Sequence, residues 1–201
     1  NTLEEAVIRG FMELVERDAV AIWWYNRLQM PELDMSSFND PYIAGLSQYY
    51  ASLGRQLWAL DLTNDLCIPV VGVVSRCVDH TTEDIVIGFA ADLDVKTALL
   101  RAVNEVGQFM PALSTRDSSG NTRYFYEDQS AIHWWQTATI DTESYLLPAE
   151  DPVRKMNNFA VSACCNQRIE VETCMELASK CGIDILVLNQ THPDIGLPVV
   201  K

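Results

Sequence analysis

The sequence predicts a mixed α/β (α+β) fold in which helices pack on a β-sheet. Apolar residues at helical spacing follow capping residues, and short β-branched runs lie between these segments. The predicted order is helix, helix, strands, helix, loop, helix, strand. The chain has 201 residues, of which 48% are hydrophobic and 21% are charged. A chain of this length and composition forms a domain with a sizeable core.

Two helices are expected at the start of the chain. Residues 2–26 carry apolar side chains at helical spacing, and Thr2 and Glu5 have the spacing of a capping box. A second helix is expected over residues 41–53, with Asp40 as its N-cap and a proline at its first position. Both helices have an apolar face, so both are expected to pack against a sheet.

Strands are expected at four apolar runs, which are residues 56–62, 68–74, 84–89 and 183–188. The second and third runs are nearly continuous and rich in β-branched residues. Continuous runs of this kind are typical of strands that are covered on both faces.

The remaining segments alternate between helix and loop. A helix is expected from residue 94 to about residue 110, ending before Pro111 because proline disrupts a helix interior. Residues 114–123 are polar and predict a loop, and 170–180 predict a helix. Residues 129–160 give no clear pattern.

Composition excludes several classes of function. The chain has 28 Asp and Glu against 14 Lys and Arg, for a formal net charge of −14. Nucleic acids and anionic membranes require a basic surface, so neither is an expected partner. No run of 18 apolar residues and no signal peptide is found. The six cysteines are interpreted as free thiols, which agrees with a cytoplasmic location. The excess of acidic residues is compatible with a cation site, in which carboxylates gather around a metal.

Three carboxylates share one face of the first helix. At about 100° per residue, Glu5, Glu13 and Glu16 fall on the side opposite the apolar stripe. Like charges at i, i+3 repel each other, and a bound cation would offset this repulsion. The alternative is an ordinary solvated face on which Arg17 pairs with Glu13.

A second polar face is expected on the helix that follows residue 94. Arg101, Glu105 and Gln108 lie at i, i+4 and i+7. An arginine beside carboxylates suits a phosphate ligand, because Mg²⁺ binds through one or two carboxylates and the phosphates of its substrate. By spacing alone, the simpler alternative is an intrahelical pair between Arg101 and Glu105.

Several segments resemble the YcaO family of ATP-dependent peptide-backbone cyclodehydratases. They are residues 1–6, 13–19 (Glu-Leu-Val-Glu-Arg-Asp-Ala), 20–27, 99–108 and 133–136 (His-Trp-Trp-Gln). Residues 20–27 and 133–136 resemble the branch that forms thiazolines and oxazolines in ribosomal peptides, including cyanobactin-type heterocyclases. The family has no P-loop, and this chain has no GxxxxGK[ST] motif.

The resemblance implies roles for eight residues. They are Glu13 and Glu16 as magnesium ligands, Asn1 and Glu5 at the nucleoside end of ATP, Arg17 and Arg101 as catalytic residues against the phosphates, and Glu105 and Gln108 lining the same site. The implied cofactors are ATP and Mg²⁺.

The resemblance also implies a reaction and partners. A Cys, Ser or Thr side chain of a ribosomal precursor peptide attacks the preceding amide, whose oxygen takes the γ-phosphoryl group of ATP. Partners in the family include a ubiquitin-activating-enzyme-like domain and a flavin oxidase, and a homodimer is left open. The family's earlier Ser/Glu motif and its proline-rich C-terminus are missing, so residues 1–201 are expected to be a partial catalytic domain, truncated at both ends. Thioamide formation and a non-catalytic peptide-binding scaffold are the alternatives.

Overall fold

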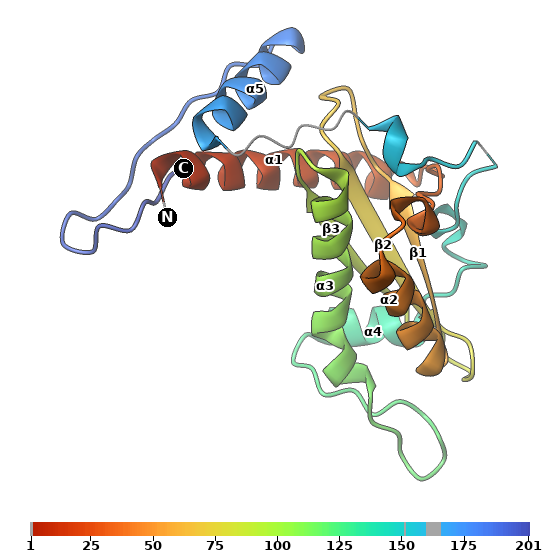
Figure 1. The fold of residues 1–201 in the computed structure, drawn as a ribbon. Helices are drawn as coiled ribbons and strands as arrows, with labels where there is room; N and C mark the ends of the chain where they lie inside the picture. Colours follow the sequence, from red (N-terminus) through yellow and green to blue (C-terminus); the bar gives the residue numbers. More distant parts are fainter. Residues whose placement is uncertain (1, 151, 160–165) are drawn as a thin grey trace.

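The structure is a computed structural model that describes residues 2–150, 152–159 and 166–201. Figure 1 shows a long first helix that crosses a small sheet, with further helices around it. The α-helices, in chain order, are α1 (Leu3–Asn26), α2 (Pro41–Ser52), α3 (Val95–Leu113), α4 (Gln129–Thr137) and α5 (Gln167–Lys180). The strands are β1 (Arg55–Asp61), β2 (Val70–Cys77) and β3 (Val86–Ala91).

The three strands form an antiparallel sheet in the order β1-β2-β3. Val73 lies opposite Ala59 of β1 and Gly88 of β3, so β2 is the central strand. β2 is buried along nearly its whole length, which confirms the prediction of strands covered on both faces. In this sheet β3 is an edge strand, and one of its sides is open to side chains from the helices.

Each face of the sheet is covered by different helices (Figure 1). Val71, Val73 and Val86 belong to the apolar cluster that contains α2 and α3. Val70 and Val74, which alternate with them on β2, belong to the cluster that contains α1. The sheet therefore lies between two helical layers, and α1 and α3 reach the β3 edge from opposite sides. This arrangement confirms the mixed α/β (α+β) fold class.

The buried face of α1 differs from the predicted apolar stripe. The residues of α1 that are buried in the core are Met12, Val15, Ala19 and Trp23. Leu14, one of the apolar residues at helical spacing in this segment, is instead 66% exposed. Glu16 is four residues after Met12 and three before Ala19, so it lies beside the buried face and not opposite it. Part of the carboxylate stripe is therefore carried into the protein interior.

One predicted helix end and one predicted strand are wrong. α3 continues through Pro111 to Leu113, because the burial of Ala112 and Leu113 in the core offsets the main-chain hydrogen bond that proline removes. Residues 183–188 form no strand, and Leu186 is 90% exposed. A β-branched run predicts an extended chain, but no described strand pairs with it.

The C-terminal segment returns to the first helix. Leu188 exchanges two main-chain hydrogen bonds with Lys201, and Gln190 donates another to Val199. This places Val200 within 3.8 Å of the position that a Cβ of Gly10 would occupy. The helix α5 lies beside α1 as well (Figure 1). The second half of the chain therefore contributes to the surroundings of α1.

Four of the six cysteines lie within the described ranges, and all four are free. Cys77 and Cys174 are buried, Cys181 is half-buried and Cys67 is exposed. Burial raises the pKa of the Cys174 thiol to about 11, so this thiol is neutral at physiological pH. Cys164 and Cys165 lie outside the described residues. None of the described helices is long and apolar enough to cross a bilayer.

A buried polar network joins β1, β2 and the loop before β3. Arg55 is 6% exposed and donates from Nη2 to the main-chain oxygens of Ser75 (3.1 Å) and Asp84 (2.6 Å). The Asp84 carboxylate is fully buried and accepts from Tyr124 Oη at 2.7 Å and from Thr122 Oγ1 at 2.5 Å. Its charge compensates Arg55, and burial together with this carboxylate raises the pKa of Tyr124 to about 12.

Asp84→Asn is expected to lower the free energy of unfolding by about 3 kcal/mol, because it leaves the buried Arg55 cation uncompensated. Asparagine tolerates the positive φ of 42° at this position, so the effect comes from the charge. Urea titration followed by tryptophan fluorescence measures it. Asp65→Asn, at an exposed position, is the control and should change stability little. Equal stabilities of the two variants would contradict the assigned role of Asp84.

Candidate functional site

Three of the charged residues that the sequence singled out approach the open edge of β3: Glu16, Glu105 and Arg101. Glu105 of α3 accepts a hydrogen bond at Oε2 from the main-chain N–H of Phe89, with an N···O distance of 2.5 Å. This bond shows that Phe89 directs its main-chain groups away from β2. Because directions alternate along a strand, Ile87 and Ala91 face the same open edge. The edge is therefore a row of main-chain donors and acceptors next to acidic side chains.

Glu16 approaches the same edge from α1. Burial raises the pKa of its carboxyl group, and the nearby charges of Glu105 and Glu13 raise it further. A hydrogen bond from the Ala91 main chain and the charge of Arg101 act in the opposite direction. Carboxylates from α1 and α3 thus converge on one strand, and the balance of their charges is unfavourable without a cation.

Arg101 adds the positive charge at this point. Its Nη1 donates to the Ala91 carbonyl oxygen at 3.3 Å and lies 3.5 Å from Oδ2 of Asp92. The structure therefore does not form the intrahelical pair with Glu105 that spacing alone favoured. Sequence reasoning missed Asp92, which comes directly after β3; the predicted third strand ended at residue 89, two residues before the observed end at Ala91. The Arg101 side chain is 38% exposed and so remains accessible to an anion.

Glu13 and Arg17 form a pair on the outer side of the helix. The distance from Arg17 Nε to Glu13 Oε1 is 2.7 Å, and the side chains are 74% exposed for Arg17 and 50% for Glu13. This is the solvated i, i+4 pair considered above as the alternative. An exposed pair of this kind contributes little to stability, so either group can change partner at small cost.

Glu5 lines a separate polar cavity of about 220 Å³ between α1, α5 and the segment after β3. Arg9, Asp92, Gln167 and Glu170 line the same cavity. Asp92 therefore connects this cavity with Arg101. The α5 residues were not predicted, because only the tertiary fold brings them to α1. Gln108 is exposed on α3, one turn beyond Glu105, and Asn1 lies outside the described residues.

The donors at the β3 edge fit a hard divalent cation with phosphate. Mg²⁺ prefers oxygen ligands, and Glu16 brings a carboxylate to this edge, whereas Glu13 lies three residues before it on α1. Within the described ranges, no three His, Cys, Asp or Glu side chains are close enough to hold a metal by themselves. Mg²⁺ commonly uses one or two protein carboxylates and takes further ligands from substrate phosphates. The convergence of Glu16 and Glu105 on neighbouring positions of one strand edge supports this fit, since a bound cation would offset the repulsion between the two carboxylates.

The fold and the site together define a class: a small α/β domain that gathers carboxylates and an arginine at a sheet edge and lacks a P-loop. A family model described as "YcaO cyclodehydratase, ATP- and Mg²⁺-binding" matches residues 1–201. The chain therefore belongs to the YcaO family, whose cofactors are ATP and Mg²⁺.

Solved structures agree with this assignment. The chain superposes over its full length on "Heterocyclase in complex with substrate and Cofactor" with a TM-score of 0.91 and 42% identity, covering 26% of that protein. The heterocyclase TruD gives a TM-score of 0.88 at 41% identity, with 27% of its length covered. The YcaO protein of Methanopyrus kandleri, bound with AMPPCP and Mg²⁺, shares the fold with a TM-score of 0.73 at 22% identity over 51% of its length. The chain spans 52% and 34% of two curated relatives.

Proposed function

We propose that the full-length protein catalyses the ATP- and Mg²⁺-dependent cyclodehydration of Cys, Ser or Thr in a ribosomal precursor peptide, giving thiazolines or oxazolines. The observation that carries this proposal is the convergence of Glu16, Glu105 and Arg101 on the open edge of β3. The heterocyclases that share 41–42% identity with the chain support this reaction over other backbone modifications.

Each charged residue has a task in this proposal. Glu13 and Glu16 hold the metal, and Arg101 and Arg17 orient and neutralise the phosphates. Glu5 and Asn1 contact the nucleoside end, and Glu105 and Gln108 line the site. ATP with Mg²⁺ supplies the γ-phosphoryl group. The nucleophile belongs to the peptide, so no cysteine of this chain takes part in the reaction.

The protein acts mainly by positioning, as in other phosphoryl transfers. The peptide Cys, Ser or Thr side chain attacks the preceding amide carbon, and the amide oxygen takes the phosphoryl group. The attack closes the five-membered ring; phosphate then leaves with that oxygen while the nitrogen loses its proton, and the C=N bond of the azoline forms. We place the reaction in the cytoplasm, where ATP and free thiols coexist. A ubiquitin-activating-enzyme-like domain that delivers the peptide, and a flavin oxidase that acts on the product, are the proposed partners.

The test uses full-length protein, Mg-ATP and a Cys-containing precursor peptide from a known heterocyclase system. We expect the peptide to lose one water per modified residue only when both ATP and Mg²⁺ are present. Mass spectrometry distinguishes this loss from the oxygen-to-sulfur exchange of thioamide formation. Calorimetry with Mg-ATP tests the alternative that the protein is a non-catalytic peptide-binding scaffold, because such a scaffold would not bind the nucleotide.

A further inference from the structure

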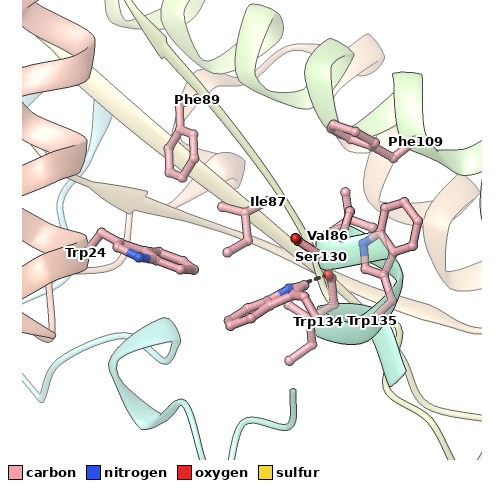
Figure 2. A pocket seen from close by; sticks show the side chains of 10 residues that line it. Trp24, Val86, Ile87, Phe89, Phe109, Ser130, Trp134 and Trp135 are labelled. Carbon is pink, nitrogen blue, oxygen red and sulfur yellow. Dashed lines mark hydrogen bonds between the residues drawn. The ribbon is translucent and has the colours of Figure 1, made fainter. Parts of the chain in front are cut away.

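An apolar pocket lies next to the charged site, along the same edge of β3. It has a volume of about 420 Å³ and is lined by residues from α1, β3, α3 and α4. Figure 2 shows Trp24, Phe109, Trp134 and Trp135 around it, with Ile87 and Phe89 of β3 directed toward its centre. Among the residues that the structure describes, no Asp, Glu, Lys or Arg lines this pocket. Its chemistry therefore suits an apolar or aromatic side chain and not a phosphate.

The strand edge beside this pocket has one open position. At Ile85 the carbonyl oxygen accepts from Trp134 Nε1 at 3.0 Å, which Figure 2 marks with a dashed line. The N–H of Phe89 donates to Glu105, and the main-chain groups of Ala91 face Glu16 and Arg101. Ile87 lies between these positions and directs its N–H and C=O to the same side. Among the described side chains, none caps Ile87.

We propose that this edge binds the peptide substrate as a short added strand, paired with the main chain of Ile87, with an apolar or aromatic side chain in the pocket. The proposal deepens the proposed function and rests on it. An extended peptide suits a strand edge because main-chain hydrogen bonds give affinity and a neighbouring pocket selects a side chain. Pairing ends at Phe89, because Glu105 already takes that N–H.

The geometry links peptide binding to the reaction site. Strand residues rise by about 3.4 Å, so Phe89 is roughly 7 Å and Ala91 roughly 14 Å beyond Ile87 along the edge. A peptide that pairs at Ile87 and then leaves the edge brings its next amides toward Glu105, Glu16 and Arg101. The aromatic pocket therefore selects a peptide residue that lies a few positions before or after the residue to be cyclised.

The first test reads the main-chain pairing from the peptide. The probe is a short synthetic peptide of Thr and Gly with one Phe and one Cys, added to full-length protein with Mg²⁺ and a non-hydrolysable ATP analogue. N-methylation at the residue paired with Ile87 should weaken binding about tenfold, and methylation at the adjacent residues should have little effect. Equal affinity for every N-methylated peptide would overturn the proposal.

The second test fills the pocket. Ala131→Trp, on the α4 wall, should raise the dissociation constant of the Phe peptide about tenfold and leave that of its Phe→Ser analogue unchanged. The affinity for Mg-ATP should stay at the wild-type value. Ala44→Trp, on an exposed position of α2, is the matched control. An unchanged affinity for the Phe peptide in Ala131→Trp would overturn the docking site.

Other occupants give different results. A segment of the same protein could fill the pocket instead. In that case Ala131→Trp lowers the melting temperature of the peptide-free protein, and Ala44→Trp leaves it unchanged. Wild-type protein then binds the Phe peptide and the Ser peptide with equal affinity. If a second copy fills the pocket, Ala131→Trp changes the oligomeric state in size-exclusion chromatography. Both outcomes overturn the proposal. If wild-type protein forms no azoline, the proposed function is rejected. If wild-type protein forms azolines and Ala131→Trp binds the Phe peptide with unchanged affinity, only the docking site is rejected.

Discussion

Glu16→Gln in the full-length protein is expected to abolish ATP-dependent azoline formation while leaving the protein folded. Glu16 is the half-buried carboxylate at the β3 edge, and the other charges around it are placed by α1 and α3. Glutamine keeps the shape and the ability to accept from Ala91, but it cannot neutralise a divalent cation. We expect the rate to fall by at least about a hundredfold, as is common when an electrostatic group in a reaction site is removed.

The same substitution should slightly stabilise the metal-free protein. Glu105 and Glu13 repel the ionised carboxylate, and burial disfavours its charge. The neutral side chain should therefore raise the free energy of unfolding by about 0.5 kcal/mol or less. Thermal unfolding with EDTA measures this gain. A loss of activity together with a gain in stability would assign Glu16 to ligand binding, because substitution of a purely structural residue would lower both activity and stability.

The pH dependence has a defined sign. The pKa of Glu16 is raised above its ordinary value of 4.5, so the folded state binds the proton more tightly than the unfolded state. The stability that this group contributes is fully present below pH 4.5 and is lost as pH rises through the raised pKa. Glu16→Gln should therefore match the protonated wild-type protein in acid and exceed wild-type stability at neutral pH. Mg²⁺ affinity of the wild-type protein should fall as pH decreases through this pKa, because protons compete with the metal.

A matched control separates this effect from a general loss of negative charge. Glu176→Gln makes the same change on an exposed position of α5, away from the β3 edge. It should retain wild-type activity and change the free energy of unfolding little, as is usual at an exposed position. Wild-type azoline formation in Glu16→Gln, measured by mass spectrometry under saturating Mg-ATP, would reject the proposed metal role.

The sequence was sufficient to locate the helices that carry the candidate site. Helical spacing placed Glu13 and Glu16 together on α1 and Arg101 and Glu105 together on α3, because those spacings depend only on local geometry. Which strand edge they meet depends on tertiary packing. The main-chain groups of Phe89 and Ala91 have no side-chain signature, so no pattern could show that the carboxylates cap them.

Other parts of the fold were missed for similar reasons. The helix α4 has nine residues, and its Asp128 N-cap is followed by too few apolar positions to show a helical period. Trp135 of α4 is buried, and Trp134 donates a hydrogen bond to the carbonyl oxygen of Ile85. The packing of α4 is therefore set by the sheet that this helix covers. Residues 183–188 gave the opposite error, since their β propensity could not indicate the absence of a partner strand.

Gly88→Ala is expected to damage the fold and the site together. An added Cβ would lie 2.3 Å from the carbonyl oxygen of Ala102 and 2.8 Å from the main-chain nitrogen of Val106. Both contacts are with the backbone of α3, so no side-chain rotation relieves them. The helix must shift away from β3, and we expect a loss of about 3 kcal/mol in the free energy of unfolding, the upper end of the usual range for overpacking.

The shift should also reach the nucleotide site, because α3 carries both Arg101 and Glu105. The bond from Phe89 to Glu105 and the contact of Arg101 with Ala91 span the interface that Gly88 keeps close. Folded Gly88→Ala protein should therefore bind Mg-ATP more weakly by calorimetry at low temperature. Gly45→Ala, on α2, provides the control, because the added Cβ would meet nothing within 4 Å. It should raise the free energy of unfolding by about 0.5–1 kcal/mol, because alanine reduces the backbone freedom of the unfolded chain. Wild-type nucleotide affinity in Gly88→Ala would show that the position of α3 against β3 does not control the site.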